Sequence, residues 1–486
     1  NTRHGIANHK MEVPRMAEKE NRRKTGTIAI ADVVWDPKVY PRSKYSTGTI
    51  ERYADAMLAG DEFPPLVLED GTNRMLDGKH RIEAYKRAEI TEAPVEWHTI
   101  PDGMSAKYYA ATLSSRHGDR MSNADLKALA EEEFDVENMP DVAEWGKRLG
   151  VSQRTVYYWV SHIINRAKAN REAKAWRLSA LGWTQREIGE RLGVTHQQVS
   201  NDLANNCNLA KICQDLGEQW NEQGVAEWAN RVGVSLTDAM AAAMKGMDDE
   251  ARMKLLGIKV QPYDVWNFPG CHNLMGDKHP GRIPGEIVCH ALWYWTKPGD
   301  LVLDPMAGSG TTLDACLLMG RCARGYDIDE RHARVDIEKH DLSQGWPDKA
   351  KEADLIFWDP PYFSKMDHGT IGEDGYIEGS ISGLSPNEYI EWLGDRLAEL
   401  HATAKQGARI AFLMSDWDPE NAKEYADSNG IFVWDYADIL RNAGWRLFRQ
   451  VQVPLPTQQI HPDIVNKFRA SRRMARLNRY LLGGVK

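Results

Sequence analysis

The sequence lacks the patterns that mark zinc-binding, disulfide-rich and membrane proteins. Its six cysteines contain no C-x-x-C pair, and the spacing of Cys271-His272 and Cys289-His290 matches no standard zinc site. No apolar run is long enough to span a membrane, and we expect no signal peptide. We therefore expect free thiols in a reducing cytosol, no bound metal, no membrane contact and a cytoplasmic location. The cysteines are Cys207, Cys213, Cys271, Cys289, Cys316 and Cys322.

Basic residues are slightly outnumbered by acidic ones and are unevenly spread. The net charge of −9 over 486 residues excludes a polycation, and the length predicts several domains. Basic residues gather in the first 24 residues, which resemble an arm, and between Arg441 and Lys486. We interpret Arg469 to Arg479 as a helix whose Arg472 and Arg473 contact DNA phosphates. Arginines that merely flank an apolar helix stripe are the alternative.

A glycine-rich stretch, Asp304-Pro305-Met306-Ala307-Gly308-Ser309-Gly310-Thr311-Thr312, follows the apolar run Leu301 to Leu303. We expect it at the carboxyl end of a strand, with the two threonines opening a helix whose N–H groups can meet an anion. There is no G-x-G-x-x-G or G-K-[ST] spacing here, so dinucleotide and P-loop interpretations fit poorly. Asp327, at the end of a second expected strand, can accept hydrogen bonds from ribose hydroxyls. The stretch therefore predicts a ligand site rather than a purely structural turn.

A second polar stretch, Asp359-Pro360-Pro361-Tyr362, follows the apolar run Leu355 to Phe357. Two prolines stiffen the backbone and remove two donors, which leaves the Pro360 carbonyl available. This carbonyl and the Asp359 carboxylate are two acceptors that suit one exocyclic amine, and Tyr362 offers a face for a stacked base. A Pro-Pro turn with a packed tyrosine is the structural alternative.

Residues from about 262 to 486 resemble amino-group DNA methyltransferases that use S-adenosylmethionine. The resemblance rests on these two stretches and on Asp264-Val265-Trp266-Asn267, His279-Pro280 with Pro284, and Gly325-Tyr326-Asp327. It implies a Rossmann-like α/β domain and a catalytic Asp359-Pro360-Pro361-Tyr362. Aspartate at the head of that stretch is more typical of adenine N6 than of cytosine N4 enzymes. The implied cofactor-binding residues are Asp304, Pro305, Ala307, Gly308, Gly310, Thr311, Asp327 and Asp341.

The chemistry expected of such a site follows from the amine. Its lone pair is delocalised into the base, and accepting bonds from both N–H groups would favour a tetrahedral nitrogen that can attack the sulfonium methyl group. Asp359 and the Pro360 carbonyl would then act by positioning and electrostatics. Because the amine is inaccessible inside a duplex, the target base must be flipped out.

The middle of the chain carries a repeated helical pattern. Residues 141–159 and 184–200 each read as helix, glycine-centred turn and helix, which predicts two helix-turn-helix segments. Residues 225–235 are a partial third copy. The residues that follow this copy are less suited to contact bases, so we expect it to serve packing. The predicted DNA-contacting residues of the first two copies are Arg154, Gln197, Gln198, Ser200 and Asn201.

The N-terminal region resembles the ParB/sulfiredoxin-like fold through Leu76-Asp77-Gly78-Lys79-His80-Arg81-Ile82 and Ser114-Ser115-Arg116-His117-Gly118. In relatives this glycine turn binds nucleotide phosphate, as the start of a helix at Arg81 would allow. The implied nucleotide contacts are Gly78, His80, Arg81 and Arg116. No cysteine lies in this region, which excludes sulfiredoxin chemistry. A degenerate scaffold that only positions DNA is the alternative.

The sequence thus predicts a multidomain protein: a basic arm (1–24), an α+β ParB/sulfiredoxin-like domain (25–118), an all-α middle made of a helix-turn-helix (119–165) and a second one with a helical linker (166–248), and an α/β methyltransferase domain (249–486). The predicted function is methyl transfer from S-adenosylmethionine to the N6 amine of a flipped adenine in double-stranded DNA. A homodimer and a nucleotide at the ParB-like domain are left open. The alternatives are a cytosine-N4 DNA or RNA amino-methyltransferase, and a DNA-binding partition or regulatory protein with a vestigial methyltransferase domain.

Overall fold

The computed structural model describes residues 24–42, 46–114, 121–136, 141–204, 226, 229, 234–278, 281–330, 334–362, 381–417, 419, 429–455, 462–472 and 478–486. The chain forms two compact units, Asn1–Ala167 and Lys168–Lys486, and each is treated by itself. The finer division into five parts stays a prediction.

A four-stranded mixed sheet begins the first unit, in the order β1-β4-β2-β3. β4 pairs antiparallel with β1 and parallel with β2, and β3 is antiparallel to β2. Leu66, Leu68, Ile82 and Val95 are in its core. α2 begins at Lys79, two residues before the predicted start at Arg81. The elements are β1 (Lys24–Ala29), the 3-10 helix η1 (Ile30–Asp32), α1 (Thr47–Leu58), β2 (Leu66–Glu69), β3 (Met75–Asp77), α2 (Lys79–Arg87) and β4 (Glu92–His98).

Helices complete the first unit around the buried Trp145, whose ring stacks on Tyr108 with the centroids 4.1 Å apart. These helices are α3 (Ala106–Ser114), α4 (Asn123–Glu133), α5 (Val142–Leu149) and the first part of α6 (Gln153–Ala180). The rest of α6 belongs to the second unit. None of the helices among the described residues combines the length and the apolar character that a membrane span needs.

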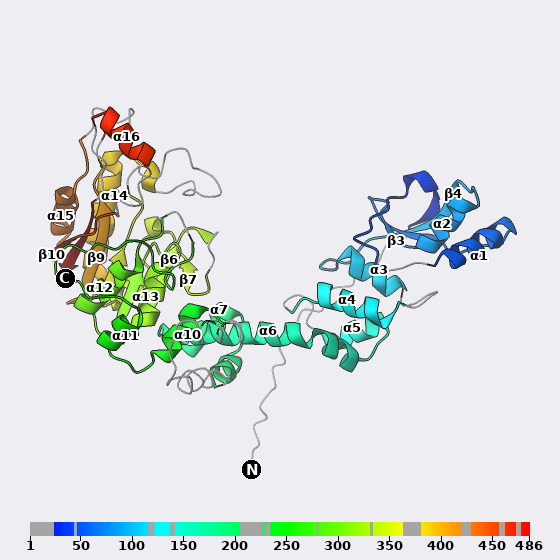
Figure 1. Cartoon of the computed structure of the whole chain (residues 1–486), viewed down its shortest axis with the longest axis horizontal. Coiled ribbons are helices and arrows are strands. Elements are labelled where there is room, and N and C mark those ends of the chain that lie inside the picture. The colour runs from blue at the N-terminus through cyan, green and yellow to red at the C-terminus, as the bar shows by residue number, and fades with distance from the viewer. Residues whose placement is uncertain are drawn as a thin grey trace, which may run out of the picture. The chain divides into compact units, whose positions relative to one another are not determined.

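The second unit is built on a seven-stranded sheet in the order β10-β11-β9-β8-β5-β6-β7 (Figure 1). β7, β6, β5, β8 and β9 run parallel, and β11 and then β10 add in antiparallel pairing. The strands are β5 (Leu301–Asp304), β6 (Cys322–Asp327), β7 (Ile337–Lys339), β8 (Leu355–Trp358), β9 (Arg409–Ser415), β10 (Arg446–Gln452) and β11 (Arg479–Val485).

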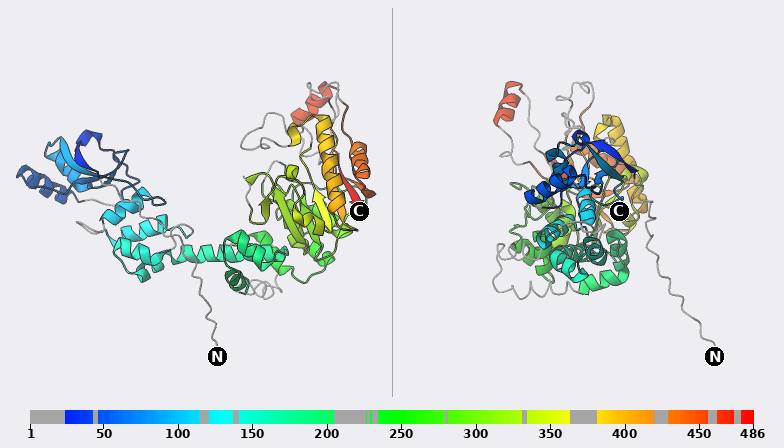
Figure 2. Two further views of the ribbon diagram at one scale, coloured as in Figure 1. Left: turned by 180° about the vertical axis from the view of Figure 1, so that it is seen from behind. Right: turned by 90° about the vertical axis from the view of Figure 1, so that its right-hand side faces the viewer.

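Helices cover both faces of this sheet, which makes three layers (Figures 1 and 2). Alternate strand residues divide between two cores: Val302 and Phe357 pack with α10 to α13, whereas Leu303 and Trp358 pack with α14 and α15. Strands buried on both faces explain why these runs are uniformly apolar in the sequence. The helices are α7 (Gln185–Leu192), α10 (Leu236–Ala243), α11 (Asp249–Leu255), α12 (Gly285–Trp295), α13 (Thr311–Met319), α14 (Pro386–Thr403), α15 (Val433–Asn442) and α16 (Pro462–Ala470), with the 3-10 helices η3 (Leu342–Gln344), η4 (Asp348–Glu352) and η5 (Ile381–Gly383).

Candidate active site

The order of the strands in the larger sheet reverses between β5 and β8. From β5 the chain moves outward to β6 and β7, then returns to β8 and β9 on the other side of β5. β5 and β8 are parallel neighbours, paired through Val302–Leu355 and Leu303–Ile356, so their carboxyl ends lie at one edge. Open α/β sheets bind ligands at such a reversal. The predicted placement of both polar stretches at strand ends is confirmed, because the glycine stretch follows β5 and Asp359 follows β8.

The residues from Asp304 to Thr312, here called the glycine loop, turn the chain from β5 into α13. Gly310, with a φ of 82°, is the N-cap of that helix, and a Cβ there would collide with the guanidinium of Arg334. Gly308 also has a positive φ, of 47°. Thr311 lies buried in the first turn, where helix N–H groups have no partners within the helix. The loop can therefore present backbone donors to an anionic group.

Asp327, at the end of β6, holds the glycine loop from the side. Its Oδ2 accepts the Gly308 N–H at 2.8 Å, and its Oδ1 accepts the Asp329 N–H at 2.8 Å. Ala307 N–H donates to the Tyr326 carbonyl at 2.8 Å, so β6 and the loop are joined twice. Pro305 and Ala307 are buried. The carboxylate thus lies beside the loop, within reach of a ligand that the loop would bind.

Asp304 is buried at the end of β5, and its Oδ1 accepts the Met306 N–H at 3.0 Å. Burial raises the pKa of Asp304 to about 7, and the negative charges of Asp359 and Asp327 add to the rise, against hydrogen bonds from Thr312 and Met306. Asp304, Asp359 and Asp327 lie at or directly after the ends of β5, β8 and β6, so their charges influence one another. Asp304 is therefore poorly suited to carry a full charge near neutral pH.

The second half of the site, here called the amine half, is Asp359 to Tyr362. The Tyr362 hydroxyl donates to Asp359 Oδ1 at 2.6 Å, and the Tyr389 hydroxyl of α14 donates to the Pro361 carbonyl at 2.9 Å. Among the described residues, none donates a backbone or side-chain hydrogen bond to the Pro360 carbonyl. Two acceptors at one short turn suit an amine with two N–H groups.

Burial raises the pKa of Asp359 to about 6, although the hydrogen bond from Tyr362 and the positive charge of Arg479 both lower it. At neutral pH the carboxylate is therefore largely ionised and can accept hydrogen bonds. The Tyr362 hydroxyl bond is a contact that the sequence did not indicate. It fixes one oxygen of the carboxylate within the turn.

Arg479 is a site residue that sequence reasoning misplaced. The interpretation of Arg469 to Arg479 as one helix is wrong: α16 ends at Ala470, Arg472 has a φ of 54°, and Arg479 begins strand β11 with 5% of its surface exposed. The run from Tyr480 to Val485 pairs with both β9 and β10, and these strand contacts outweigh a local helical pattern. Arg472 is exposed, and Arg473 lies outside the described residues.

Asp341 lies just after β7, at the far edge of the sheet from β10. It is the N-cap of η3, and its carboxylate accepts the Ser343 N–H at 2.9 Å. The His340 N–H donates to the Asp327 carbonyl at 2.9 Å, which connects this turn to the end of β6. A role for Asp341 toward the cofactor stays a prediction.

Two helix pairs in the chain share one turn geometry. In the first pair, Gly150 (φ 71°) is the C-cap of α5 and α6 follows. In the second, Gly193 (φ 64°) is the C-cap of α7 and residues 196–204 are helical. A Cβ on the inner glycine of either pair would approach a turn carbonyl to 2.8 Å. These inner glycines are Gly146 and Gly189. We call the two the first and second glycine-turn pairs.

The residues predicted to contact DNA bases differ in their exposure and in their hydrogen bonds within the protein. Arg154, Gln197 and Asn201 are exposed, and Gln197 Nε2 lies 3.2 Å from Asn201 Oδ1. Ser200 and Gln198 are half-buried, and Gln198 Nε2 donates to the buried Asp202 at 2.7 Å. Gln198 is thus held by the protein itself. Most of the third copy lies outside the described residues.

In the first unit, Gly78 (φ 112°) is the N-cap of α2. His80 Nε2 accepts the Ser46 N–H at 3.0 Å. Arg81 donates to the carbonyls of Pro64 and Pro65 and to Asp77 at 2.6–2.7 Å, so much of its guanidinium is engaged by the chain. Arg116 lies outside the described residues. The nucleotide contacts therefore stay predictions, with Arg81 already engaged in holding the turn.

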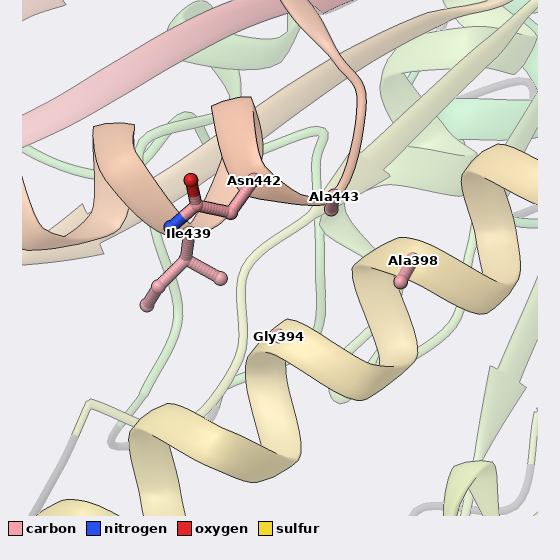
Figure 3. A pocket seen from close by; sticks show the side chains of 5 residues that line it. All are labelled: Gly394, Ala398, Ile439, Asn442 and Ala443. Carbon is pink, nitrogen blue, oxygen red and sulfur yellow. The ribbon is translucent and has the colours of Figure 1, made fainter.

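Two cavities lie away from the glycine loop and the amine half. One, of about 200 Å³, lies between α14 and α15 (Figure 3) and is lined by Gly394, Ala398, Ile439, Asn442 and Ala443. The other, of about 500 Å³, adjoins the edge strand β10 and is lined by Pro262, Tyr263, Asp264, Trp266, Tyr294, Trp295, Phe448, Arg449 and Val451. Neither contains a predicted catalytic or cofactor-binding residue.

Part of the chain is similar to known DNA methylases. The family described as DNA methylase matches residues 218–339, which include the glycine loop and Asp327 and end before Asp359. The DNA adenine methyltransferase YhdJ of Escherichia coli (strain K12) is 32% identical over 84 residues, which are 17% of this chain and 29% of that protein. The Type II methyltransferase M.BglII of Bacillus subtilis is 37% identical over 90 residues, 18% of this chain and 24% of that protein. The matched stretches thus span less than a third of the length of either relative.

A solved structure is similar to the chain more distantly. It is the C-terminally truncated chromosome-partitioning protein ParB from Caulobacter crescentus, complexed with CTP-gamma-S. The match covers 28% of this chain and 76% of that chain, with 16% sequence identity and a TM-score of 0.18. A likeness this weak carries no argument about function.

Proposed function

We propose that the chain is a DNA methyltransferase that moves a methyl group from S-adenosylmethionine to the exocyclic N6 amine of adenine. One observation carries this proposal: the glycine loop and Asp359 follow β5 and β8, the two strands that flank the reversal of strand order. That arrangement brings a donor-rich loop next to a pair of acceptors. The match to the DNA methylase family and the printed name of the Escherichia coli relative support it.

The residues of the glycine loop fit the cofactor. The N–H groups at the start of α13 suit a carboxylate, and the Asp327 carboxylate beside the loop suits ribose hydroxyls. When bound, S-adenosylmethionine supplies an electrophilic methyl group. Glycine at position 310 leaves no side chain between the loop and the Arg334 guanidinium behind it. The loop backbone is therefore held in place before any ligand arrives.

In the amine half, Asp359 and the Pro360 carbonyl would each accept one hydrogen bond from the amine. Both bonds favour a tetrahedral nitrogen. Its lone pair is then no longer delocalised into the ring and can point at the methyl group. S-adenosylmethionine held by the glycine loop would supply the methyl group and leave as its thioether, and the nitrogen held by Asp359 and the Pro360 carbonyl would pass its excess proton to water. Tyr362 holds one Asp359 oxygen, and the positive charge of Arg479 helps to keep that carboxylate ionised.

We further propose that duplex DNA is engaged by the glycine-turn pairs. The exposed side chains of Arg154, Gln197 and Asn201 support contacts with base edges or phosphates. Arg472 is exposed as well and offers another phosphate contact. At the start of α2, the turn at Gly78 and His80 would contact a nucleotide phosphate.

The test uses the purified full chain with S-adenosylmethionine carrying a tritiated methyl group. Label is offered to duplex DNA of mixed sequence and, separately, to single-stranded RNA at one salt concentration. We expect label in DNA alone and none with Asp359→Ala. Label that enters RNA at least as fast as DNA would replace the DNA proposal with RNA methylation, and equal transfer by Asp359→Ala would remove the catalytic assignment.

A further inference from the structure

A cluster of five charged side chains lies behind the glycine loop. The cluster combines three carboxylates with two guanidiniums, and each side chain is at most 13% exposed. We call it the buried charge cluster. Its members are Arg177, Asp238, Asp314, Arg334 and Asp336.

The two arginines bridge the three carboxylates. Arg177 donates Nη1 to Asp238 at 2.7 Å, Nε to Asp336 at 2.8 Å, and Nη2 to Asp314. Arg334 spans Asp314, with Nη2–Oδ1 at 2.7 Å, and Asp336, with Nε–Oδ1 at 3.1 Å. Burial opposes ionisation of Asp336, but the charges of Arg177 and Arg334 outweigh it and lower the pKa of that carboxyl. The arginines therefore keep Asp336 ionised although it is buried, whereas burial raises the pKa of Asp238.

The buried charge cluster reaches the glycine loop through Arg334, while Asp314 holds Gly276, whose neighbour Asp277 also contacts the loop. Arg334 Nη1 donates to the Ser309 carbonyl at 2.8 Å, and its guanidinium occupies the space that a Cβ on Gly310 would need. Asp314, in the first turn of α13, accepts the Gly276 N–H at 2.7 Å. The Asp277 N–H donates to the same Ser309 carbonyl at 3.0 Å. The cluster thus fixes the backbone that would face the cofactor.

Part of this support comes from the helical segment, defined here as residues 168–204 with α10. Arg177 lies on α6 and Asp238 on α10. Arg191, in the last turn of α7, donates to the carbonyls of Arg334 at 3.0 Å, Val335 at 2.8 Å and Ile337. Arg177 and Arg191 both precede residue 218, where the DNA methylase match begins. Residues outside that matched stretch therefore support the part of the sheet that carries the glycine loop.

We propose that Arg177 is a positioning residue for the methyl donor: acting through Asp314 and Arg334, it holds the glycine loop in the shape that binds S-adenosylmethionine. This inference rests on the proposed function. It makes the helical segment a part of the cofactor pocket in addition to any role with DNA. Loss of Arg177 leaves three buried carboxylates facing one guanidinium, and the loop backbone must shift as the cluster rearranges.

The experiment compares two buried arginines in the full chain. Arg177→Met removes the cluster contact at the start of α13. Arg321→Met is the matched control, because Arg321 is fully buried and pairs with Asp249, but it contacts the carbonyl of Met319 at the other end of α13. S-adenosylmethionine affinity is measured by calorimetry, kcat and KM by methyl transfer to DNA, and Tm by thermal unfolding.

Both variants should lower Tm. Only Arg177→Met should raise the KM and Kd for S-adenosylmethionine, on the order of tenfold, while kcat at saturating cofactor stays within about threefold. Arg177→Lys, which retains one charge and one donor group, should recover part of that affinity. Equal changes of KM in Arg177→Met and Arg321→Met would overturn the positioning role, as would an unchanged KM in Arg177→Met.

A second variant covers the case in which Arg177→Met does not fold. Arg334→Lys keeps the charge of the cluster but cannot reach Ser309, Asp314 and Asp336 together, so it should also raise KM. An unchanged KM in Arg334→Lys would contradict the inference. Measurements on the unaltered chain distinguish a failure of the proposed function from a failure of the positioning role. If it fails to bind S-adenosylmethionine, the proposed function is wrong; if it binds and the variants bind equally well, only the positioning role is wrong.

Discussion

The glycine loop and the amine half lie at the ends of neighbouring strands, yet they are supported very differently. The glycine loop is held by Asp327 from the side and by Arg334 from behind. The amine half relies on two tyrosine hydroxyls, and no described residue donates to its Pro360 carbonyl. A ligand bound by backbone N–H groups needs that backbone fixed, whereas a passing amine needs acceptors that are still available. The contrast predicts that changes in the two halves will affect different kinetic constants.

The largest expected effect lies in the amine half. Asp359→Ala removes one of the two proposed acceptors, so methyl transfer at saturating cofactor should fall on the order of a hundredfold or more. S-adenosylmethionine affinity should stay close to that of the unaltered chain, because the glycine loop is untouched. Single-turnover transfer and calorimetry on the same preparation measure the two quantities. A variant that loses cofactor affinity instead would erase the contrast between the halves.

The converse change is Asp327→Ala in the cofactor half. It removes the acceptor of the Gly308 N–H and the proposed ribose contact, so S-adenosylmethionine binding should weaken by about 1–3 kcal/mol. The value of kcat at saturating cofactor should change far less than in Asp359→Ala. Calorimetric affinities and a cofactor titration of the rate check this. Unchanged affinity would place the ribose contact on another residue.

The two glycine-turn pairs offer a related comparison with a smaller effect. Arg191→Ala removes the bonds from α7 to residues 334–337 and should lower the free energy of unfolding by about 1–2 kcal/mol. Arg154→Ala removes an exposed side chain and should leave Tm unchanged, while DNA affinity falls by about 1–3 kcal/mol if Arg154 reads a base. Thermal unfolding and DNA titration at one salt concentration distinguish them. Equal losses of Tm would mean that both pairs serve the fold.

The smallest expected effect is a shift in pH dependence. Transfer needs ionised Asp359, whose pKa is raised to about 6, so activity should be present above that pH and be lost as the pH falls through it. Tyr362 donates to the ionised form and thereby lowers this pKa. Tyr362→Phe should therefore move the acidic limb of the rate profile to higher pH. A limb that stays in place or moves to lower pH would show that Asp359 does not set it.

The sequence predicted those features of the site that depend on local pattern. Asp304 and Asp359 each follow a short apolar run, and glycine or proline beside them marks the end of the strand, so both were placed correctly. The turns of the glycine-turn pairs could also be predicted, because Gly150 and Gly193 are each the C-cap of a helix.

Long-range contacts were not predictable in the same way. Arg177 meets Asp314 across 137 positions of sequence and Asp336 across 159, and no periodicity connects them. Arg479 was grouped with neighbouring arginines because its pairing with β9 depends on a strand far away in the chain. Gln198 looked like a base reader, but the buried Asp202 one turn later engages its amide. In each case tertiary contacts decided what a locally ambiguous residue does.

The most direct test of the account identifies the methylated base. The full chain and Asp359→Ala are expressed in cells whose DNA carries no methylated bases, and the DNA is digested to nucleosides and analysed by mass spectrometry. We expect N6-methyldeoxyadenosine with the unaltered chain and none with Asp359→Ala. N4-methyldeoxycytidine in its place, or equal N6-methyldeoxyadenosine from the two proteins, would contradict it.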